Sequence, residues 1–591
     1  MKRENQDYDF VVIGGGMAGV CAAIAAARQG CRTALVQDRP VLGGNSSSEI
    51  RMHVCGADYF CNAGARRETG ILEELRLENL ARNPQRSSAM WDLLLHEWAS
   101  REPRLSLFLN SVALEPLMRD PAHIQAVRVR QLAAERELVL SAPLFADCSG
   151  DGQIGAQAGA EFRMGREAAA EFNETLAESA ADRHTLGSSL MFMARDMGRP
   201  MPFVKPDWVP SFPSDAALQH REHGRYQFGY WWIEWGGQLD TIHDNERIRD
   251  ELLKITLGIW DHIKNHGDHG AQNWALEWVG MLPGKRESRR FVGDYILRQS
   301  DLESGRIFND EVAYGGWPID VHPIEGFNSP EYPCRQIQVP LYSIPLRALF
   351  SRNIANLFFA GRNVSASHIA FASTRIMATC ALMGQAVGTA AAVCHARKLA
   401  PSQAAQSAIE LIQQRLLADD CFLLGKKNAD ASDLARQAGV SAGSFKPGYE
   451  PGKVTDGVAR PYRDDEHCWE SAPLAESGAW LALTWPQAVT IRQLQLTFDS
   501  ELEKRLIFSQ IDSIYTDPSI LTAMPGRLLK HFELQMRAAS GWETVRVVAD
   551  NRQRVRRELF DPPLTTDAIR LRCKAAYNYP AARLFEIRAY A

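Results

Sequence analysis

The chain has 591 residues, of which 45% are hydrophobic and 23% charged, a composition typical of a globular protein with two or three domains. Its formal net charge of −5 at pH 7 and its pI of about 6.3 give no reason to expect a nucleic acid or an anionic membrane as partner. No apolar run stands out as a membrane span, and the polar start leads directly into the first expected strand without a signal peptide.

The first expected element is a strand, a glycine turn and a helix of the kind that binds a dinucleotide. Residues 10–13 are apolar, three glycines follow, and residues 20–27 are rich in alanine. Gly14 permits the turn, Gly16 lets the backbone approach a pyrophosphate, and Gly19 lets the helix pack closely on the strand. The helix N-terminus then offers free N–H groups to the phosphates.

The second expected strand, residues 32–36, ends in Gln37, Asp38 and Arg39. Dinucleotide sites place an acidic residue here to accept hydrogen bonds from the adenosine ribose hydroxyls. Gln37 occupies the usual glutamate position, where its amide oxygen can still accept a hydroxyl, and Asp38 is its neighbour. Because Arg39 is the single basic residue that follows, we expect no 2′-phosphate.

A second glycine motif, Leu-Gly-Gly-Asn-Ser-Ser-Ser, follows at residues 42–48. A GxGxxG turn followed by this segment resembles FAD-dependent oxidoreductases of the glutathione-reductase/fumarate-reductase type. The resemblance implies that residues 43–46 lie beside the pyrophosphate and ribityl chain of the flavin. A flexible Gly/Ser loop is the alternative.

The next segments follow the same resemblance. Apolar spacing predicts helices within residues 66–100, and alternation predicts strands over 105–146, matching the β-meander that such flavoproteins insert. Residues 147–151, Asp-Cys-Ser-Gly-Asp, resemble the family's D-A/C-T/S-G-D turn against the flavin nucleotide. A plain Asp-Gly turn is the alternative.

The last expected nucleotide-domain elements lie between residues 356 and 396. A strand ends at Gly361, a loop carries His368, and a long helix is expected to begin near Ser373 or Thr374 with a hydroxyl cap. The resemblance implies that this helix points its N-terminus at the flavin, where its dipole would stabilise negative charge on the reduced ring. The candidate FAD-binding residues are Gly14, Gly16, Met17, Ala18, Gly19, Gln37, Asp38, Arg39, Gly43, Gly44, Asn45, Ser46, Asp147, Ser149, Gly150, Gly361, Arg362, Ser373, Thr374 and Arg375.

Residues 166–345 are expected to form a substrate domain. Within them, residues 225–240 interleave aromatic rings with Glu, Gln and Asp, as a sugar site does, although aromatic strands of a hydrophobic core give the same pattern. His262 and His266 are spaced to share a metal on one helix face, but no HExxH motif or cysteine completes a site. We therefore interpret them as a solvated helix end and expect no metal.

Residues 282–294 contain the sequence Arg-Glu-Ser-Arg-Arg, which resembles a segment of the flavoprotein branch often found beside polysaccharide-degrading genes. Three arginines around one glutamate are costly to bury unless they serve each other, the flavin or an anionic or carbonyl group. An exposed helix of paired charges is the alternative.

The carboxyl-terminal part is expected to be a separate β-sandwich. Two helices, residues 401–418 and 429–439, form a bridge, and strand-like alternation begins near residue 446. This part resembles the coagulation-factor-type C (discoidin-like) sandwich; sugar binding and simple packing on the enzyme both remain open. The fold class is α/β, a Rossmann-like FAD domain with an inserted substrate domain plus an antiparallel β-sandwich, divided as 1–165, 166–345, 346–400, 401–445 and 446–591.

The resemblance implies an FAD-dependent oxidoreductase that oxidises a secondary alcohol, such as a sugar hydroxyl, by hydride transfer to flavin N5. His368 is the first candidate base and His53 the second, while Arg286 and Arg289 would orient the substrate or stabilise an oxyanion. A covalent flavin link through His53 or Cys55 is a further option. The electron acceptor is unidentified.

Two other functions stay open. One is a redox-neutral enzyme that cleaves a glycoside by oxidation and elimination, and the other is a carbohydrate-binding protein with a vestigial flavin fold. The 11 cysteines are scattered without a CxxC pair, as is typical of a reducing compartment, so we expect a cytoplasmic protein.

Overall fold

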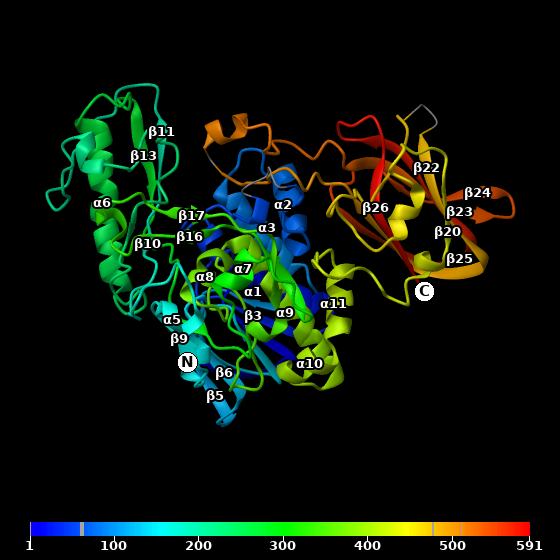
Figure 1. Cartoon of the computed structure of the whole chain (residues 1–591), viewed down its shortest axis with the longest axis horizontal. Coiled ribbons are helices and arrows are strands. Elements are labelled where there is room, and N and C mark those ends of the chain that lie inside the picture. The colour runs from blue at the N-terminus through cyan, green and yellow to red at the C-terminus, as the bar shows by residue number, and fades with distance from the viewer. Residues whose placement is uncertain (1, 59–63, 475–477, 510) are drawn as a thin grey trace. The chain divides into compact units, whose positions relative to one another are not determined.

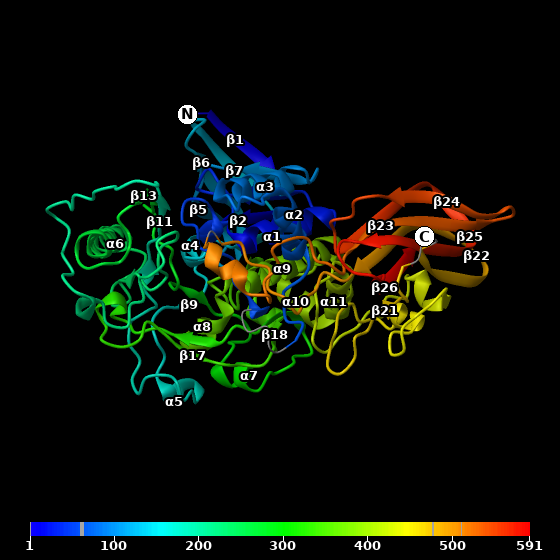
Figure 2. The same cartoon turned by 90° about the horizontal axis from the view of Figure 1, so that it is seen from above.

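The computed structural model describes residues 2–58, 64–474, 478–509 and 511–591, which form two compact units. The first unit comprises residues 1–56, 86–412 and 508–514, and the second comprises residues 57–85, 413–507 and 515–591. Each unit has a hydrophobic core of its own. The elements of both are labelled in Figures 1 and 2.

A five-stranded parallel sheet in the order β19-β8-β2-β3-β4 forms the centre of the first unit. Its strands are β2 (Phe10–Ile13), β3 (Thr33–Val36), β4 (Leu105–Phe108), β8 (Leu144–Asp147) and β19 (Leu357–Phe359). Every residue of β2, β3, β8 and β19 is buried, as expected of a parallel sheet with both faces covered. The strand order reverses beside β2, so a ligand is expected at the carboxyl ends of β2 and β8.

Two helices of small residues pack tightly beside the sheet, α1 (Met17–Arg28) and α9 (Met377–Arg397). A Cβ atom added to Gly384 of α9 would lie 2.0 Å from the carbonyl oxygen of Ala18 in α1, and Gly388 repeats this close contact one turn later. The glycines therefore bring the two helices together.

Helix α9 also corrects one sequence-based expectation. By length and composition it is apolar enough to cross a membrane, although no run was expected to be. Of its most apolar window, 94% is buried within the protein, as in a core helix.

A β-meander follows β4, as predicted. It is made of β5 (Ser111–Asp120), β6 (His123–Gln131) and β7 (Arg136–Ser141), and β1 (Lys2–Asp7) pairs in parallel with β7. β4 itself belongs to the parallel sheet, not to the meander.

The middle of the chain folds into short strands around the long helix α6 (Asn245–Asn265), which Figures 1 and 2 show beside β11 and β13. The remaining elements of this unit are α3 (Ser88–Ser100), α4 (Gln153–Gln157), β9 (Phe162–Arg163), α5 (Ala169–Phe172), β10 (Ser188–Ser189), β11 (Phe192–Asp196), β12 (Glu234–Trp235), β13 (Trp274–Val279), β14 (Arg290–Phe291), α7 (Gln299–Glu303), β15 (Glu311–Gly315), β16 (Ile319–Val321), β17 (Arg335–Ile337), β18 (Tyr342–Pro345), α8 (His368–Thr374) and α10 (Pro401–Ser407).

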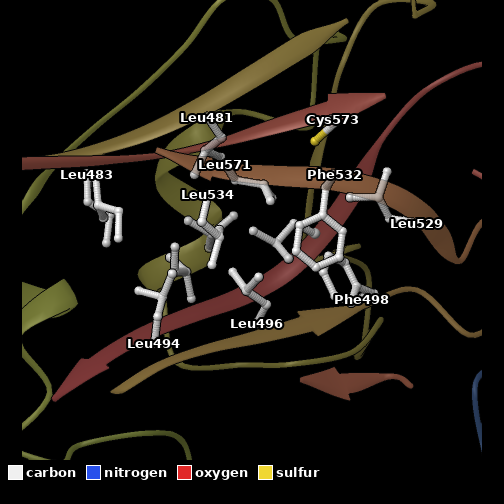
Figure 3. Close-up of a cluster of buried hydrophobic side chains, with 14 of the residues drawn as sticks. Leu481, Leu483, Leu494, Leu496, Phe498, Leu529, Phe532, Leu534, Leu571 and Cys573 are labelled. Atoms are coloured by element: carbon white, nitrogen blue, oxygen red, sulfur yellow. The ribbon is translucent and has the colours of Figure 1, made fainter. Parts of the chain in front are cut away.

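The second unit is an antiparallel β-sandwich. Its elements are α2 (Ile71–Arg82), β20 (Gly439–Ala442), β21 (Trp469–Glu470), β22 (Ala479–Phe498), β23 (Leu529–Ala538), β24 (Gly541–Val548), β25 (Val555–Ala576) and β26 (Arg583–Tyr590). β22 pairs with β20 through its first half and with β26 through its second half, so one long strand serves both layers. The buried side chains between the layers include Leu496, Phe498 and Phe532 (Figure 3). The predicted sandwich is therefore confirmed.

The segment before the sandwich corrects another expectation. The helices predicted over residues 401–418 are present as α10 and α11 (Ile409–Ala418). The helix predicted over residues 429–439 is wrong, because a short 3-10 turn at Leu434–Gln437 leads directly into β20.

Candidate active site

The glycine loop after β2 has the geometry that a dinucleotide site needs. Gly14 has φ +99°, and an added Cβ there would lie 2.5 Å from the carbonyl oxygen of Cys148. An added Cβ on Gly19 would lie 1.8 Å from the carbonyl oxygen of Gly14. Gly16 differs, because its Cβ would meet only the Cα of Gly44, at 4.0 Å. The protein itself does not require a glycine at this position, so the open space is suited to a ligand.

The two glycine motifs lie side by side, as the resemblance implied. The amide of Gly43 donates to the carbonyl of Gly15 over 2.8 Å, and Gly16 and Gly43 form a parallel bridge. Gly43 and Gly44 have φ +102° and +59°, left-handed conformations that favour glycine.

The side chains after this pair hold the loop in place. Asn45 donates to the carbonyl of Lys285 over 3.0 Å, and Ser46 donates to the carbonyl of Gly43 over 2.9 Å. Arg39 pairs with Glu49 at 3.1 Å. These hydrogen bonds fix the orientation of both side chains.

Gln37 has a different role from the one predicted. Its side-chain oxygen accepts from the amide of Gly15 over 2.7 Å, and its amide donates to the carbonyl of Val41. Gln37 is buried and fastens the glycine loop, whereas the side chain of Asp38 is 64% exposed at the same strand end. Asp38 is thus the better placed acceptor for ribose hydroxyls.

The Asp-Cys-Ser-Gly-Asp turn is held by Asp147, which ends β8 in the parallel sheet. Asp147 is fully buried and accepts from the hydroxyl of Ser149 over 2.6 Å and from the amide of Gly155 over 2.9 Å. Burial raises the pKa of this carboxyl group. The turn continues at Gly150, φ +83°, where an added Cβ would lie 2.5 Å from Nη2 of Arg362.

A charged cluster stands next to this turn. Asp151 contacts Lys285 Nζ at 2.6 Å, the Ser288 hydroxyl at 2.9 Å and Arg362 at 3.5 Å. Burial alone would raise the pKa of Asp151, but the charges of Lys285 and Arg362 hold it below the usual value. Nη1 of Arg362 is buried and, among the described residues, has no hydrogen-bond acceptor. An open glycine cradle beside a buried guanidinium fits an FAD pyrophosphate.

The helix cap predicted at Ser373 or Thr374 is wrong. Ser367 caps α8 by accepting from the amide of Ala370, and α9 begins separately at Met377. The hydroxyl of Ser373 donates to the carbonyl of Trp317, and that of Thr374 is buried without a hydrogen bond to the described residues.

The Arg-Glu-Ser-Arg-Arg segment is neither helical nor exposed, so the alternative of an exposed charged helix is excluded. Arg290 is fully buried between Glu167, at 3.0 Å, and Glu287, at 3.1 Å. Arg289 donates to the carbonyl of Asp151 over 3.1 Å and lies near Phe162. Arg289 therefore lies beside the Asp-Cys-Ser-Gly-Asp turn.

His368, the first candidate base, is paired with Glu287. Nδ1 of the imidazole lies 3.0 and 3.1 Å from the two carboxylate oxygens, and both side chains are buried. Burial alone would raise the pKa of Glu287, but His368 and Arg290 lower it, so the carboxylate stays ionised. A carboxylate at Nδ1 fixes the ring tautomer and leaves Nε2 as the basic nitrogen.

A second ionic network extends from Arg286. Arg286 Nη2 lies 3.4 Å from Glu234, which contacts His322 Nδ1 at 2.7 Å; the other ring nitrogen of His322 lies 3.0 Å from Asp320. Arg375 closes the network at 3.1 Å from Asp320. Arg375 was predicted to bind the cofactor, but the contacts of its side chain are to this network.

The charges of this network reinforce one another. Burial would lower the pKa of His322, but Glu234 and Asp320 raise it, and the positive groups in turn hold the pKa of both carboxyls low. Burial and Asp320 raise the pKa of the neighbouring Cys334 thiol to about 12, so the thiol stays protonated. Sequence reasoning missed Glu287, His322 and Asp320 as site residues.

A family model described as FAD dependent oxidoreductase matches residues 9–416. The chain belongs to this family. The matched range contains both glycine motifs, the Asp-Cys-Ser-Gly-Asp turn, the Glu287–His368 pair and the Arg286 network. Membership in this oxidoreductase family implies a flavin cofactor. A second model, Domain of unknown function (DUF7402), matches residues 433–509.

Three solved structures show what else the chain is similar to. Chitosan-binding module 1 of a chitosanase/glucanase from Paenibacillus sp. IK-5 shares 15% identity, over 27% of this chain and 98% of that one, with a TM-score of 0.20. The family 32 carbohydrate-binding module of C. perfringens NanJ, in complex with galactose, shares 12% sequence identity. The match covers 27% of this chain and 98% of that one, with a TM-score of 0.21. The family 32 module of Streptococcus pneumoniae EndoD shares 18% sequence identity. The match covers 27% of this chain and 99% of that one, with a TM-score of 0.21.

The aromatic stretch of the oxidoreductase, residues 225–240, is mostly core. Tyr230, Trp232 and Ile233 are buried in one hydrophobic cluster, so these residues are core residues, as the alternative to a sugar site stated. Trp231 is the exception, because it is 42% exposed and its ring stands edge to face with His322 at 5.8 Å between centroids.

The second candidate base, His53, lies in a loop beside α9. The carbonyl of its neighbour Cys55 accepts from the amide of Ala378 in the first turn of that helix over 3.0 Å. A catalytic role of His53, and a covalent flavin link through His53 or Cys55, stay predictions.

The histidines at the end of α6 also differ from expectation. His262 is fully buried, so the solvated helix end is wrong for this residue. His266 does not face His262; its ring pairs with Asp261 at 3.1 Å.

Proposed function

We propose that this protein binds FAD and oxidises a secondary alcohol of a carbohydrate, with His368 as the base. The observation that carries the proposal is the buried pair of His368 and Glu287. Glu287 is preceded by Arg286 of the Arg286 network and followed by Ser288, which donates to Asp151 of the Asp-Cys-Ser-Gly-Asp turn. Arg286 and Glu287 are consecutive residues, so one extended segment supplies both the cation of the Arg286 network and the carboxylate that pairs with the base.

His368 would take the hydroxyl proton at Nε2. Glu287 holds the Nδ1–H and stabilises the imidazolium that forms when the proton is taken up. When bound, FAD supplies the hydride acceptor. The first unit contributes a fixed, water-poor environment, because both side chains of the pair are buried.

The Arg286 network supports a polyhydroxylated substrate. Oε1 of Glu234, Oδ1 of Asp320 and Nε of Arg375 are buried and make no hydrogen bond to the described residues. Buried acceptors and donors of this kind suit several sugar hydroxyls, and the exposed ring of Trp231 next to them suits the C–H face of a sugar.

His322 favours a second candidate function, the redox-neutral cleavage of a glycoside. Oxidation followed by elimination requires a second proton transfer, next to the oxidised carbon, in addition to the one at the hydroxyl. Among the described residues, His368 with Glu287 and His322 with Glu234 and Asp320 are two buried imidazole–carboxylate groups, and this reaction needs two proton-transfer groups.

The test is an anaerobic titration of the purified holoprotein with a panel of sugars and glycosides, followed through the visible flavin spectrum. Bleaching by one sugar class supports alcohol oxidation, and release of an aglycone at many turnovers without an electron acceptor supports the redox-neutral reaction. A protein that cannot be loaded with FAD, or whose flavin no member of the panel bleaches, would refute the proposal.

A further inference from the structure

A cluster of three histidines and one aspartate lies in the first unit, in the part of the chain around α6. Asp215, His223, His262 and His269 each direct one nitrogen or oxygen atom inward, and these four atoms all lie within 4.8 Å of one another. They come from four separate places: a short 3-10 turn at Asp215–Leu218, the loop after it, the last turn of α6 and the loop beyond α6.

The orientation of two rings follows from backbone carbonyls. Nδ1 of His262 lies 2.7 Å from the carbonyl oxygen of Phe212, and Nδ1 of His223 lies 2.6 Å from that of Arg221. A ring nitrogen that faces a carbonyl oxygen at this distance must carry a proton. In the neutral ring, Nε2 of both histidines therefore presents a lone pair.

These lone pairs point at a carboxylate. Nε2 of His262 and His223 lie 2.9 and 3.5 Å from Oδ1 of Asp215. Two acceptors facing each other repel, so either each ring carries a second proton or one cation lies between them. The ring centroids of the three histidines are 4.7 to 5.1 Å apart, so one ion can lie within reach of all three rings. A single divalent ion resolves the conflict for all of them.

A glycine turn after α6 directs the chain so that His269 lies near Asp215. Gly267 has φ +105°, and an added Cβ would lie 3.2 Å from Nε2 of His269. Nε2 of His269 lies 3.8 Å from Asp215 Oδ1 and 3.2 Å from the carbonyl oxygen of His266. Binding an ion therefore requires that this nitrogen leave the carbonyl and that the ring proton move to Nδ1.

We propose that Asp215, His223, His262 and His269 form a binding site for a divalent metal ion of the zinc class. Imidazole and carboxylate ligands without a thiol suit Zn²⁺, and tetrahedral coordination at about 2.0–2.1 Å separates ligand atoms by about 3.3 Å. The three distances from Asp215 Oδ1, 2.9, 3.5 and 3.8 Å, bracket that separation. The carbonyls at Nδ1 are the second-layer contacts that orient metal-bound imidazoles.

The metal has a structural role that is separate from alcohol oxidation. It ties the last turn of α6 to the segments before and after the helix. The side chain of Asp215 is 78% exposed, so the ion enters from solvent without any opening of the core around buried His262.

The test measures zinc binding by the full-length FAD-loaded protein. Wild type and the variants H262Q, H223Q and D215N are stripped with a chelator and titrated with Zn²⁺ alone; bound zinc is measured by elemental analysis and Tm by calorimetry. H266Q is the matched control, because His266 lies at the same helix end but pairs with Asp261. Flavin content and circular dichroism report whether each variant folds.

Wild type and H266Q are expected to bind one zinc per chain and to gain Tm with zinc, whereas H223Q and D215N bind at least about tenfold more weakly. Wild type without bound zinc or a Tm shift would overturn the proposal, and so would H223Q and D215N that bind as tightly as H266Q. If H262Q does not fold, H223Q and D215N decide the matter. The visible spectrum of Co²⁺-substituted wild type gives a test without any variant: tetrahedral bands support the site, and their absence refutes it.

Discussion

Glu287 and His368 are 81 positions apart in the sequence, yet the carboxylate of one meets Nδ1 of the other at 3.0 Å in a buried setting. Nε of Arg290 lies 3.1 Å from Oε1 of Glu287, and Arg290 also pairs with Glu167. The ring of His368 is therefore oriented by a carboxylate that a second charge holds ionised.

Replacing Glu287 with Gln should slow flavin reduction by substrate about a hundredfold or more, because His368 loses the carboxylate that stabilises its protonated form. Arg290 keeps Glu167 as a partner, so the variant should fold. The rate constant of flavin bleaching in anaerobic stopped-flow experiments is the measurement. E167Q is the matched control: Glu167 contacts Arg290 and the backbone amide of His368 but not its ring. Equal rates in E287Q and E167Q would contradict the orienting role.

Replacing Gly16 with Ala should weaken FAD binding at least about tenfold while leaving the fold intact, because the added methyl fills the space that the pyrophosphate needs. Its Cβ would meet no protein atom closer than 4.0 Å. Flavin content after reconstitution and the Tm of the apoprotein measure the two effects. G452A is the control, since no atom lies within 4 Å of a Cβ there. A G16A protein with wild-type flavin affinity would argue against the placement of the cofactor.

The stability of the first unit should decline as the pH rises above about 6.5. The folded protein raises the pKa of His322 through Glu234 and Asp320. A raised pKa contributes stability that is complete below the unfolded pKa and is lost as the pH rises through the folded one. The lowered pKa values of Glu234 and Asp320 contribute stability that is lost only as the pH falls into the acid range, so they do not affect the decline above pH 6.5.

The measurement is the free energy of unfolding between pH 6 and 9, compared with that of H322Q. The variant should show a shallower decline with pH, whatever its absolute stability. H395Q serves as control. His395 is partly exposed, and its contact with Asp9 is long, at 3.6 Å. A decline in H322Q identical to that of wild type would show that His322 does not gain a proton on folding.

Replacing Phe532 with Ala should destabilise the β-sandwich by about 3–5 kcal/mol, because the ring fills the core between its layers. L559A, on β25, should change stability by no more than about 0.5 kcal/mol, since Leu559 is 63% exposed. Urea unfolding followed by tryptophan fluorescence compares the two. Similar losses in both variants would mean that Phe532 is not a core residue.

The sequence predicted those features that depend on residues close to one another in the chain. The roles of Gly14 and Gly19 follow from φ and from atoms within or next to the same turn, so a short motif is enough to predict them. His368 was chosen as a candidate base because a loop before a helix was expected to carry it; in the structure it is the first residue of α8. The alternating strands of the sandwich have a period that is visible without any tertiary information.

The features that the sequence could not predict depend on distant partners. Glu234 and His322 are 88 positions apart, and nothing in either segment indicates that they meet. Gln37 stands where a ribose acceptor is expected, but its partner is the amide of Gly15, which only the folded loop brings near. The cap was assigned to Ser373 because the interruption between α8 and α9 has no proline or glycine to mark it.

In the proposed reaction His368 removes the hydroxyl proton of the substrate. The most direct measurement is the anaerobic rate of flavin bleaching by the active sugar in H368N, with H395N as the matched histidine control, at equal flavin content. H368N is expected to reduce its flavin about a hundredfold or more slowly than wild type, while H395N is expected to match wild type. Bleaching of H368N at the wild-type rate would show that another group takes the proton.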